Sequence, residues 1–252
     1  MYEARDKKMS VIVKMEHVTK QFGGLTAVND FSGEIEKNAI VGLIGPNGAG
    51  KTTLFNMIAN YYHPTSGKIY FKDQDITEAR TEDMARMGLA RTFQVTKPFG
   101  DMTVLQNIMV GAFLHTTNAK QVEQKAREVA GLVGMTCDLD MIANNTTTVD
   151  KKKLEIARAL AVDPELILLD EVMAGCNPQE KLELVDTCRK VRDAGVTILI
   201  IEHDIKTIMS LCDKIYILHR GEKLVEGTPE QVANDKRAIS AYLGEDFDNA
   251  EN

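Results

Sequence analysis

The segment that most restricts the fold of this chain is GPNGAGKTT (residues 45–53), which directly follows the apolar run AIVGLI (39–44). It fits the pattern Gly-x-x-x-x-Gly-Lys-[Ser/Thr]. A buried strand before that pattern and a helix after it are the context in which it forms a phosphate-binding loop. The glycines let the backbone curl so that N–H groups point at phosphate oxygens, and the helix adds its positive N-terminal end. An ordinary glycine-rich turn is the alternative, and the full pattern in this context argues against it.

Individual residues of this loop have expected roles toward a nucleotide. Lys51 supplies a positive charge to the β- and γ-phosphates, and the Thr52 hydroxyl is a candidate ligand for Mg²⁺. The residues expected to contact the nucleotide are Gly45, Pro46, Asn47, Gly48, Ala49, Gly50, Lys51, Thr52 and Thr53. The loop therefore predicts a site for a nucleotide phosphate group together with magnesium.

A pair of carboxylates is expected to complete the site. In LILLDE (166–171) four apolar residues run directly into Asp170 and Glu171. This pattern predicts a buried strand with both carboxylates at its C-terminal end, where open α/β sheets bind ligands. Asp170 is expected to hold the metal through a water molecule, and Glu171 to polarise the water that attacks the γ-phosphate. The alternative is that the pair only caps the next turn.

Composition limits the class of protein. The chain has 252 residues, 44% of them hydrophobic and 27% charged, which is typical of a globular protein with one large domain or a domain plus a subdomain. Lys and Arg (30) are outnumbered by Asp and Glu (37), which gives a net charge of -7. This balance argues against a protein that coats nucleic acid, so a phosphate ligand must be held locally.

The sequence also lacks the marks of export, membrane insertion and metal-binding cysteines. The N-terminus MYEARDKKMS is charged and has no apolar core, so a secretory signal is not expected and a cytosolic location is. The longest apolar runs, such as VTILII (196–201), are far shorter than the roughly 20 residues that span a bilayer. The four cysteines form no CxxC pair, so neither a zinc site nor a disulfide framework is expected.

The order of strand and helix patterns predicts an α/β fold with a largely parallel sheet. Strand patterns occupy residues 11–18, 31–37, 39–45, 67–76, 166–171, 196–204 and 214–221. Helical patterns occupy residues 52–62, three segments between 101 and 163, residues 178–194 and 205–211, and two short stretches within 229–243. The block from 101 to 163, with few strand signals, is expected to be a helical insertion into the alternating elements.

Four strings besides the loop and LILLDE carry a resemblance to a known family: KQFGGLTAVND (20–30), RMGLARTFQ (86–94), LEIARALA (154–161) and GTPEQV (227–232) with ISAYLGE (239–245). Over essentially its whole length the chain resembles an ATP-binding subunit of an ABC transporter, and it is most similar to the ATPases of branched-chain amino acid importers. The resemblance implies one ABC ATP-binding domain over residues 1–252. Its α/β P-loop NTPase core (1–94 and 164–252) would have a mainly parallel sheet and an antiparallel β subdomain, and residues 95–163 would form a helical subdomain.

The resemblance also implies roles for three more residues. Phe22 matches an aromatic residue that stacks on adenine, although single aromatics more often belong to a core. Gln94 matches a glutamine that senses Mg²⁺ and the attacking water and transmits closure to the membrane subunit. His203 matches a histidine that contacts the γ-phosphate, and it ends a strand at the expected rim of the sheet. The other histidines (His17, His63, His115 and His219) are expected to be surface or packing residues.

The chain departs from the family where a Leu-Ser-Gly-Gly-Gln signature is expected, because TTTVD occupies residues 146–150. Thr147 keeps a hydroxyl, but Val149 is β-branched and does not readily adopt glycine conformations. Asp150 fits the N-cap of the following helix and would bring negative charge toward a triphosphate. The lysines at 151–153 either offset that charge or are simply solvated. Val172 and Asn177 also replace a usual proline and aspartate, which affects the expected dimer contacts.

The function implied is an ATPase, located in the cytoplasm and peripheral on the inner face of the membrane, that powers an importer. ATP would drive closure of a dimer with a second ABC ATPase, alike or different, bound to membrane permease subunits. PFGDMTVLQNIMVGAF (98–113) is either the permease groove or ordinary helical core. The alternatives are an ATP-binding switch with little hydrolysis and a soluble ABC protein acting on ribosomes or DNA. The acidic single-unit chain predicts no nucleic-acid partner, and hydrophobic amino acids are the implied cargo, with amides or urea open.

Overall fold

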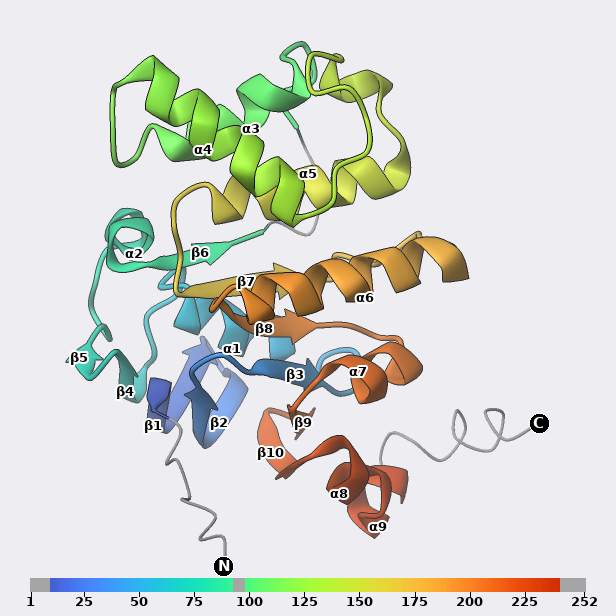
Figure 1. The fold of residues 1–252 in the computed structure, drawn as a ribbon. Helices are drawn as coiled ribbons and strands as arrows, with labels where there is room; N and C mark the ends of the chain where they lie inside the picture. Colours follow the sequence, from blue (N-terminus) through green and yellow to red (C-terminus); the bar gives the residue numbers. More distant parts are fainter. Residues whose placement is uncertain (1–9, 93–97, 241–252) are drawn as a thin grey trace, which may run out of the picture.

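The computed structural model describes residues 10–92 and 98–240, which form two sheets and the helices around them (Figure 1). The six-stranded sheet has the order β10-β9-β3-β8-β7-β6, and the four-stranded sheet has the order β2-β1-β4-β5. The strands are β1 (Val11–Phe22), β2 (Leu25–Glu36), β3 (Ile40–Ile44), β4 (Ser66–Phe71), β5 (Gln74–Asp75), β6 (Leu89–Arg91), β7 (Leu166–Asp170), β8 (Thr197–Ile201), β9 (Lys214–His219) and β10 (Glu222–Gly227).

The larger sheet is parallel except at one edge. Strands β3, β6, β7, β8 and β9 pair in parallel, and β10 turns back antiparallel to β9. The smaller sheet is antiparallel throughout. These observations confirm the predicted α/β core with a mainly parallel sheet and an antiparallel β subdomain.

The described helices confirm the predicted helical segments with changes in their bounds, and they add α2 and the 3₁₀ helix η1, which the sequence patterns did not predict. They are α1 (Lys51–Ile58), α2 (Thr81–Met87), α3 (Val104–Ala112), α4 (Ala119–Leu132), the short 3₁₀ helix η1 (Ala143–Asn145), α5 (Thr148–Leu160), α6 (Pro178–Asp193), α7 (Ile205–Leu211), α8 (Pro229–Ala233) and α9 (Lys236–Ala238). Figure 1 shows α3, α4 and α5 grouped together at one end of the molecule, away from the four-stranded sheet. The chain boundaries of this helical group at 94/95 and 163/164 stay a prediction.

Helix α1 ends four residues earlier than its apolar pattern predicts. Ile58 is its last residue, and the Ala59 N–H donates to the Phe55 carbonyl as the C-cap. Asn60 then takes a left-handed conformation with φ of 53°, which an α-helix does not tolerate in its interior. Its side-chain amide donates to the Ile76 carbonyl at 2.7 Å, so a buried tertiary hydrogen bond stabilises the turn.

The core is divided by the large sheet into two apolar clusters. Alternate residues of a strand point to opposite faces. Ile40 and Ile44 of β3 therefore pack with helices α3 to α9, whereas Val41 and Leu43 pack with α1, α2 and the four-stranded sheet. The central strands β3, β7 and β8 are buried along their whole length. These buried central strands fix the positions of the loops that follow them.

Candidate active site

The phosphate loop after β3 adopts conformations that only glycine accepts at two points. Gly45 and Gly50 have φ of 147° and 99°. A Cβ atom on Gly45 would lie 2.1 Å from the Leu218 carbonyl oxygen, and one on Gly50 would lie 2.4 Å from the Ala27 carbonyl oxygen. The backbone is thus packed tightly against β9 and β2, which holds the curled loop in place.

Helix α1 begins directly from this loop and offers its first N–H groups. Gly50 is the N-cap, and no side chain caps the helix. The Leu54 N–H makes the first helical bond, to the Gly50 carbonyl at 2.9 Å. The N–H groups of Lys51, Thr52 and Thr53 precede that bond and have no acceptor within the helix, so they can bind an anion.

Lys51 lies inside the curl of the loop. Its side chain is only 6% exposed, and its Nζ donates to the carbonyls of Gly45 (2.7 Å) and Pro46 (3.0 Å). Burial lowers the pKa of Lys51, while the negative charges of Glu171 and Asp170 act in the opposite direction. The predicted loop lysine and the two predicted carboxylates are therefore near enough to interact electrostatically.

The carboxylates stand at the C-terminal end of β7, as predicted. Asp170 is the last residue of the strand and is 4% exposed. Burial and the neighbouring Glu171 raise the pKa of Asp170, whereas Arg91, His203 and Lys51 favour its charged form. A buried anion of this kind is well suited to a cation, because the low dielectric strengthens their attraction.

Glu171 and His203 are brought together from two neighbouring strand ends. Glu171 has φ of 50°, an uncommon value for a residue with a side chain, and its N–H donates to the Ile201 carbonyl at 2.9 Å. His203 follows β8, and its Nε2 lies 2.7 Å from Glu171 Oε1. Their side chains remain 22% and 47% exposed, so solvent and a ligand can reach the pair. A carboxylate oriented in this way can accept a proton from water.

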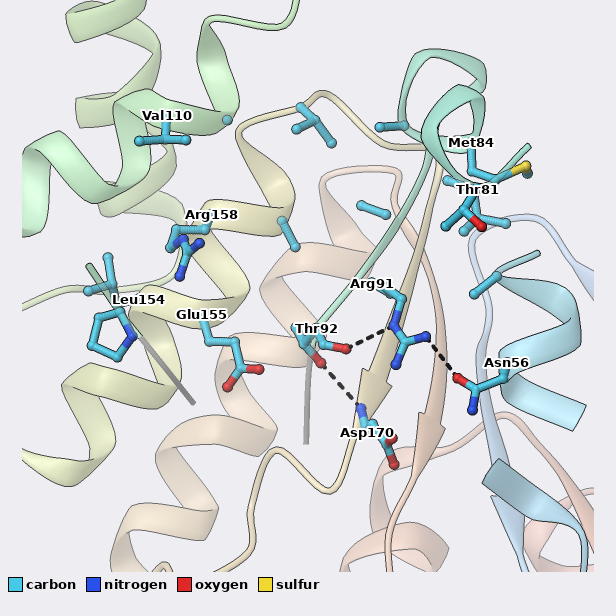
Figure 2. A pocket seen from close by; sticks show the side chains of 18 of the residues that line it. Asn56, Thr81, Met84, Arg91, Thr92, Val110, Leu154, Glu155, Arg158 and Asp170 are labelled. Carbon is cyan, nitrogen blue, oxygen red and sulfur yellow. Dashed lines mark hydrogen bonds between the residues drawn. The ribbon is translucent and has the colours of Figure 1, made fainter. Parts of the chain in front are cut away.

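A groove of about 820 Å³ lies beside Asp170, between the helical group on one side and α1, α2 and β6 on the other. Figure 2 shows Val110, Leu154 and Arg158 on the helical side and Arg91, Thr92 and Asp170 on the sheet side. The predicted metal ligands Thr52 and Asp170 both line it. The groove therefore connects the helical group directly to residues of the phosphate site.

Arg91, Thr92 and Asn56 are residues of this site that the sequence did not single out. The Arg91 Nη1 donates to Asn56 Oδ1 of α1 at 2.8 Å, and the Asp170 N–H donates to Thr92 Oγ1 at 3.3 Å (Figure 2). Burial lowers the pKa of Arg91, and the charge of Asp170 opposes that shift. Arg91 and Thr92 lie inside the RTFQ string, but no pattern indicated which of its side chains face the groove.

Of the two residues Phe22 and Gln94, whose roles the family resemblance implies, only Phe22 lies in the described part of the chain. Phe22 ends β1 and is 42% exposed, with its ring edge-on to Tyr62 at a centroid distance of 5.3 Å. It therefore keeps a free part of its ring, unlike a fully buried core residue, and its contact with adenine stays a prediction. Gln94 lies outside the described residues.

The TTTVD segment differs from its expected structure at its cap. Thr147, and not Asp150, is the N-cap of α5, because the Thr147 hydroxyl accepts the Asp150 N–H at 3.2 Å. The same hydroxyl donates to Asp150 Oδ2 at 2.8 Å, which leaves Asp150 in the first helical turn and 4% exposed. The Thr147 proton is thus engaged within its own chain.

The three lysines that follow, at 151–153, differ in their burial. Lys153 is 5% exposed and donates to the Gly134 carbonyl and to Glu183, so the expectation that it is solvated is wrong. Lys151 and Lys152 are partly exposed. In the other departure from the family pattern, Asn177 is the N-cap of α6 in a capping box with Glu180.

Residues 10–92 and 98–240 contain no cluster of three or more His, Cys, Asp or Glu side chains suited to a metal. A Mg²⁺ site of one hydroxyl, one carboxylate and substrate phosphates would not form such a cluster. In the same residues no helix has the length and apolar character needed to cross a bilayer.

Known proteins with similar sequences are ATP-binding proteins of ABC transporters. The ABC transporter family model matches residues 28–174, and a model described as branched-chain amino acid ATP-binding cassette transporter matches residues 222–248. The chain is 39% identical to the high-affinity branched-chain amino acid transport ATP-binding protein LivG of Escherichia coli K12, over 93% of this chain and 98% of LivG. BraF of Pseudomonas aeruginosa, which carries the same description, is 37% identical, with coverage of 93% and 98%.

A solved structure extends the match to the fold. The crystal structure of a nucleotide-free ATP-binding cassette from an ABC transporter has a TM-score of 0.84 to this chain at 28% identity, with 92% of this chain and 99% of that chain covered. The loop geometry, the paired carboxylates and these similarities lead to one conclusion. The chain belongs to the ABC transporter family, as one of its ATP-binding and ATP-hydrolysing subunits.

Proposed function

We propose that this subunit powers an importer of branched-chain or other hydrophobic amino acids by hydrolysing ATP at the site built around Lys51, Asp170, Glu171 and His203. The observation that carries the catalytic part is the 2.7 Å contact between Glu171 and His203 beside the phosphate loop. The cargo is inferred from the descriptions of the relatives LivG and BraF.

Nucleotide binding rests on the loop and the start of α1. The N–H groups of Lys51, Thr52 and Thr53, with the Lys51 ammonium, would bind the phosphates, and Phe22 would stack on the adenine. The Thr52 hydroxyl and the Asp170 carboxylate suit Mg²⁺, which prefers oxygen ligands and keeps several waters; both line the same groove. When bound, the ion would neutralise negative charge on the phosphates, with Gln94 as a further proposed ligand.

Hydrolysis requires a water molecule positioned in line with the γ-phosphate. Glu171 would orient that water and accept its proton. With a proton on Nε2, His203 donates to the Glu171 carboxylate and so fixes its direction. Because His203 is also about half exposed, it can contact the γ-phosphate once ATP is bound.

The test of this mechanism is phosphate release at saturating MgATP, measured with the chain alone and mixed with its paired ATPase. We expect Glu171→Gln to reduce turnover by about a hundredfold or more. Glu128→Gln, an exposed residue of α4, is the matched control and should keep the wild-type rate. If the mixture shows no turnover and Glu171→Gln changes nothing, the chain is an ATP-binding switch.

The partner subunits follow from the groove. A permease helix would enter the space beside α3, where Val110 (43% exposed) and Phe99 (44% exposed) offer apolar surface near Arg158. This arrangement would hold the subunit at the inner face of the membrane. Binding there would act on Thr52 and Asp170 through the groove that they share.

The second ATPase subunit is expected to be a different chain. The Thr147 hydroxyl, which is the one surviving signature donor, is already bonded to Asp150. A nucleotide closed by this segment would therefore lack that donor, and loss of one such donor typically costs about 10²–10³ in rate. A partner with an intact signature would complete the site on this chain's phosphate loop, which gives one fast and one slow site.

Separate mutation of the two catalytic glutamates tests this asymmetry. In the reconstituted pair, Glu171→Gln should abolish most of the turnover, whereas the equivalent change in the partner should remove little. Equal losses from the two changes would show that both sites hydrolyse ATP and would contradict the asymmetric model.

A further inference from the structure

Glu202 is a buried carboxyl between two elements of the proposed catalytic site. It lies directly after β8 and before His203, and only 4% of it is exposed. Its Oε1 accepts the backbone N–H of Met173 at 2.8 Å. The site described above has no role for this residue, and no sequence pattern pointed to it.

Burial makes a carboxyl at this position costly. The pKa of Glu202 is raised from 4.5 to about 7, chiefly by burial, with Glu171 adding to the shift. Within the described part of the chain, no lysine, arginine or histidine forms an ion pair with Glu202 at 4.0 Å or less. An apolar residue of similar size avoids this desolvation penalty. The carboxyl is therefore expected to matter through the hydrogen bond that it makes.

That hydrogen bond is one of three that join the ends of β7 and β8. Beyond the last ladder pair, Asp170 with Ile201, the Glu171 N–H donates to the Ile201 carbonyl. The Met173 N–H donates to Glu202, and His203 contacts the Glu171 carboxylate. The contacts from Glu202 and His203 thus fix successive parts of the segment that carries Glu171.

The segment after β7 needs such support because its backbone is irregular. Glu171 has φ of 50°, and residues 171–175 form tight turns with bonds from Ala174 N–H to the Glu171 carbonyl and from Cys176 N–H to the Met173 carbonyl. The Met173 N–H points away from these local bonds, toward Glu202. Without an acceptor there, a buried N–H would be unsatisfied and the turn would shift to satisfy it.

We infer that Glu202 is a positioning residue for ATP hydrolysis: its carboxyl oxygen holds the turn after β7 through Met173 N–H, and this keeps Glu171 within reach of His203. The inference rests on the proposed catalytic roles of Glu171 and His203. It requires an acceptor atom at this position and does not require a negative charge.

The experiment compares Glu202→Gln, which keeps an acceptor, with Glu202→Met, which removes it at similar volume. Both are assayed for kcat and KM with MgATP in the full chain paired with its second ATPase. We expect Glu202→Met to lower kcat by about ten- to a hundredfold, as for a misplaced catalytic group, and to leave KM within about threefold. Glu202→Gln should restore kcat to within about threefold of the wild type.

Thr187→Val is the control for loss of a buried hydrogen bond elsewhere. Thr187 of α6 is 2% exposed, and its hydroxyl donates to the Val133 and Glu183 carbonyls, which are not part of the segment 171–175. Circular dichroism melts confirm that each variant is folded at the assay temperature. Thr187→Val should keep the wild-type kcat.

Each outcome decides one question. A wild-type kcat for Glu202→Met, or equal losses in the Met and Gln variants, would overturn the positioning role. If Glu202→Met does not fold, Glu202→Leu is compared with Glu202→Gln instead. A Glu202→Gln variant that is fully folded but has a kcat tenfold below the wild type also overturns the positioning role. Failure of the wild-type pair to hydrolyse ATP would instead refute the proposed function.

Discussion

At the scale of single residues, two glycines next to or within helices differ in what a side chain would meet. Gly50 has φ of 99°, and a Cβ there would lie 2.4 Å from the Ala27 carbonyl oxygen. Gly131 lies within α4, and a Cβ there meets no atom within 4 Å. We expect Gly50→Ala to destabilise the fold by a few kcal/mol and to weaken MgATP binding strongly, because the phosphate loop must open to make room for the added methyl group.

Gly131→Ala is the matched control, since the same methyl group enters a helix with free space. It should leave MgATP affinity unchanged and raise stability by up to about 1 kcal/mol, because alanine favours the helix. Urea unfolding and equilibrium titration with MgATP measure both effects. Unchanged nucleotide affinity in Gly50→Ala would contradict the tight packing of the phosphate loop.

The buried Glu202 carboxyl predicts a pH-dependent stability. Its folded-state pKa of about 7 lies above its ordinary value of 4.5, so its contribution is fully present below pH 4.5 and is lost as the pH rises through 7. One pKa unit corresponds to about 1.4 kcal/mol. The unfolding free energy of Glu202→Gln minus that of the wild type should therefore be larger at pH 8 than at pH 4, by a few kcal/mol.

Besides burial, the backbone N–H of Met173 favours ionisation of Glu202, Glu171 opposes it, and the charge and backbone N–H of His203 favour it. The thiols of Cys176 and Cys188 also lie near. Urea unfolding at the two pH values, with Thr187→Val as the control that keeps the carboxyl, measures the difference. If the difference in unfolding free energy between the wild type and Glu202→Gln is the same at both pH values, Glu202 is not held in a low-dielectric site.

At the scale of elements, local patterns predict most of the strands and helices, although not α2, β6 or β10, and they predict the ends of helices less well. The strand before the phosphate loop and LILLDE follow from runs of apolar residues, and both emerge as buried strands. The end of α1 depends on the tertiary bond from Asn60 to Ile76, which no local pattern contains. The sequence predicts Asp150 as the N-cap of α5, whereas the N-cap is Thr147; threonine and aspartate both cap helices, and only the backbone geometry distinguishes them.

The dependence on contacts between distant segments also limits which residues of the site could be predicted. Lys51, Asp170 and Glu171 are carried by a motif and by strand ends, so their proximity follows from parallel-sheet topology. Arg91, Asn56 and Glu202 act through contacts between segments distant in sequence. Such contacts leave no spacing pattern in a single chain.

The capping role of Thr147 can be measured directly. Thr147→Ala removes the acceptor of the Asp150 N–H and should cost about 1 kcal/mol of unfolding free energy, whereas Thr147→Ser should retain most of it. Thr148→Ala is the control, since Thr148 is exposed at the first helical position and makes no cap bond. Urea unfolding of the three variants tests the assignment, and equal losses for Thr147→Ala and Thr148→Ala would contradict it.

At the scale of the whole molecule, the large sheet separates the phosphate site from the helical group, yet the groove joins them. Strand β6 leads from the sheet to Arg91 and Thr92, which bond α1 and Asp170. A movement of the helical group would therefore be transmitted to α1 and to the end of β7, the two elements that we propose to bind the phosphates and the metal. This arrangement is suited to coupling between nucleotide state and a partner bound in the groove.

Val110 and Leu182 provide a test of that groove, because both are exposed apolar residues on helices. Val110 of α3 is 43% exposed and lines the groove, whereas Leu182 of α6 is 63% exposed and lies outside it. Val110→Glu should weaken binding to the permease subunits in lipid nanodiscs by about tenfold or more, since a buried unpaired carboxylate is costly at an interface. Leu182→Glu should bind within about twofold of the wild type. Equal affinities for the two variants would place the permease contact on another surface.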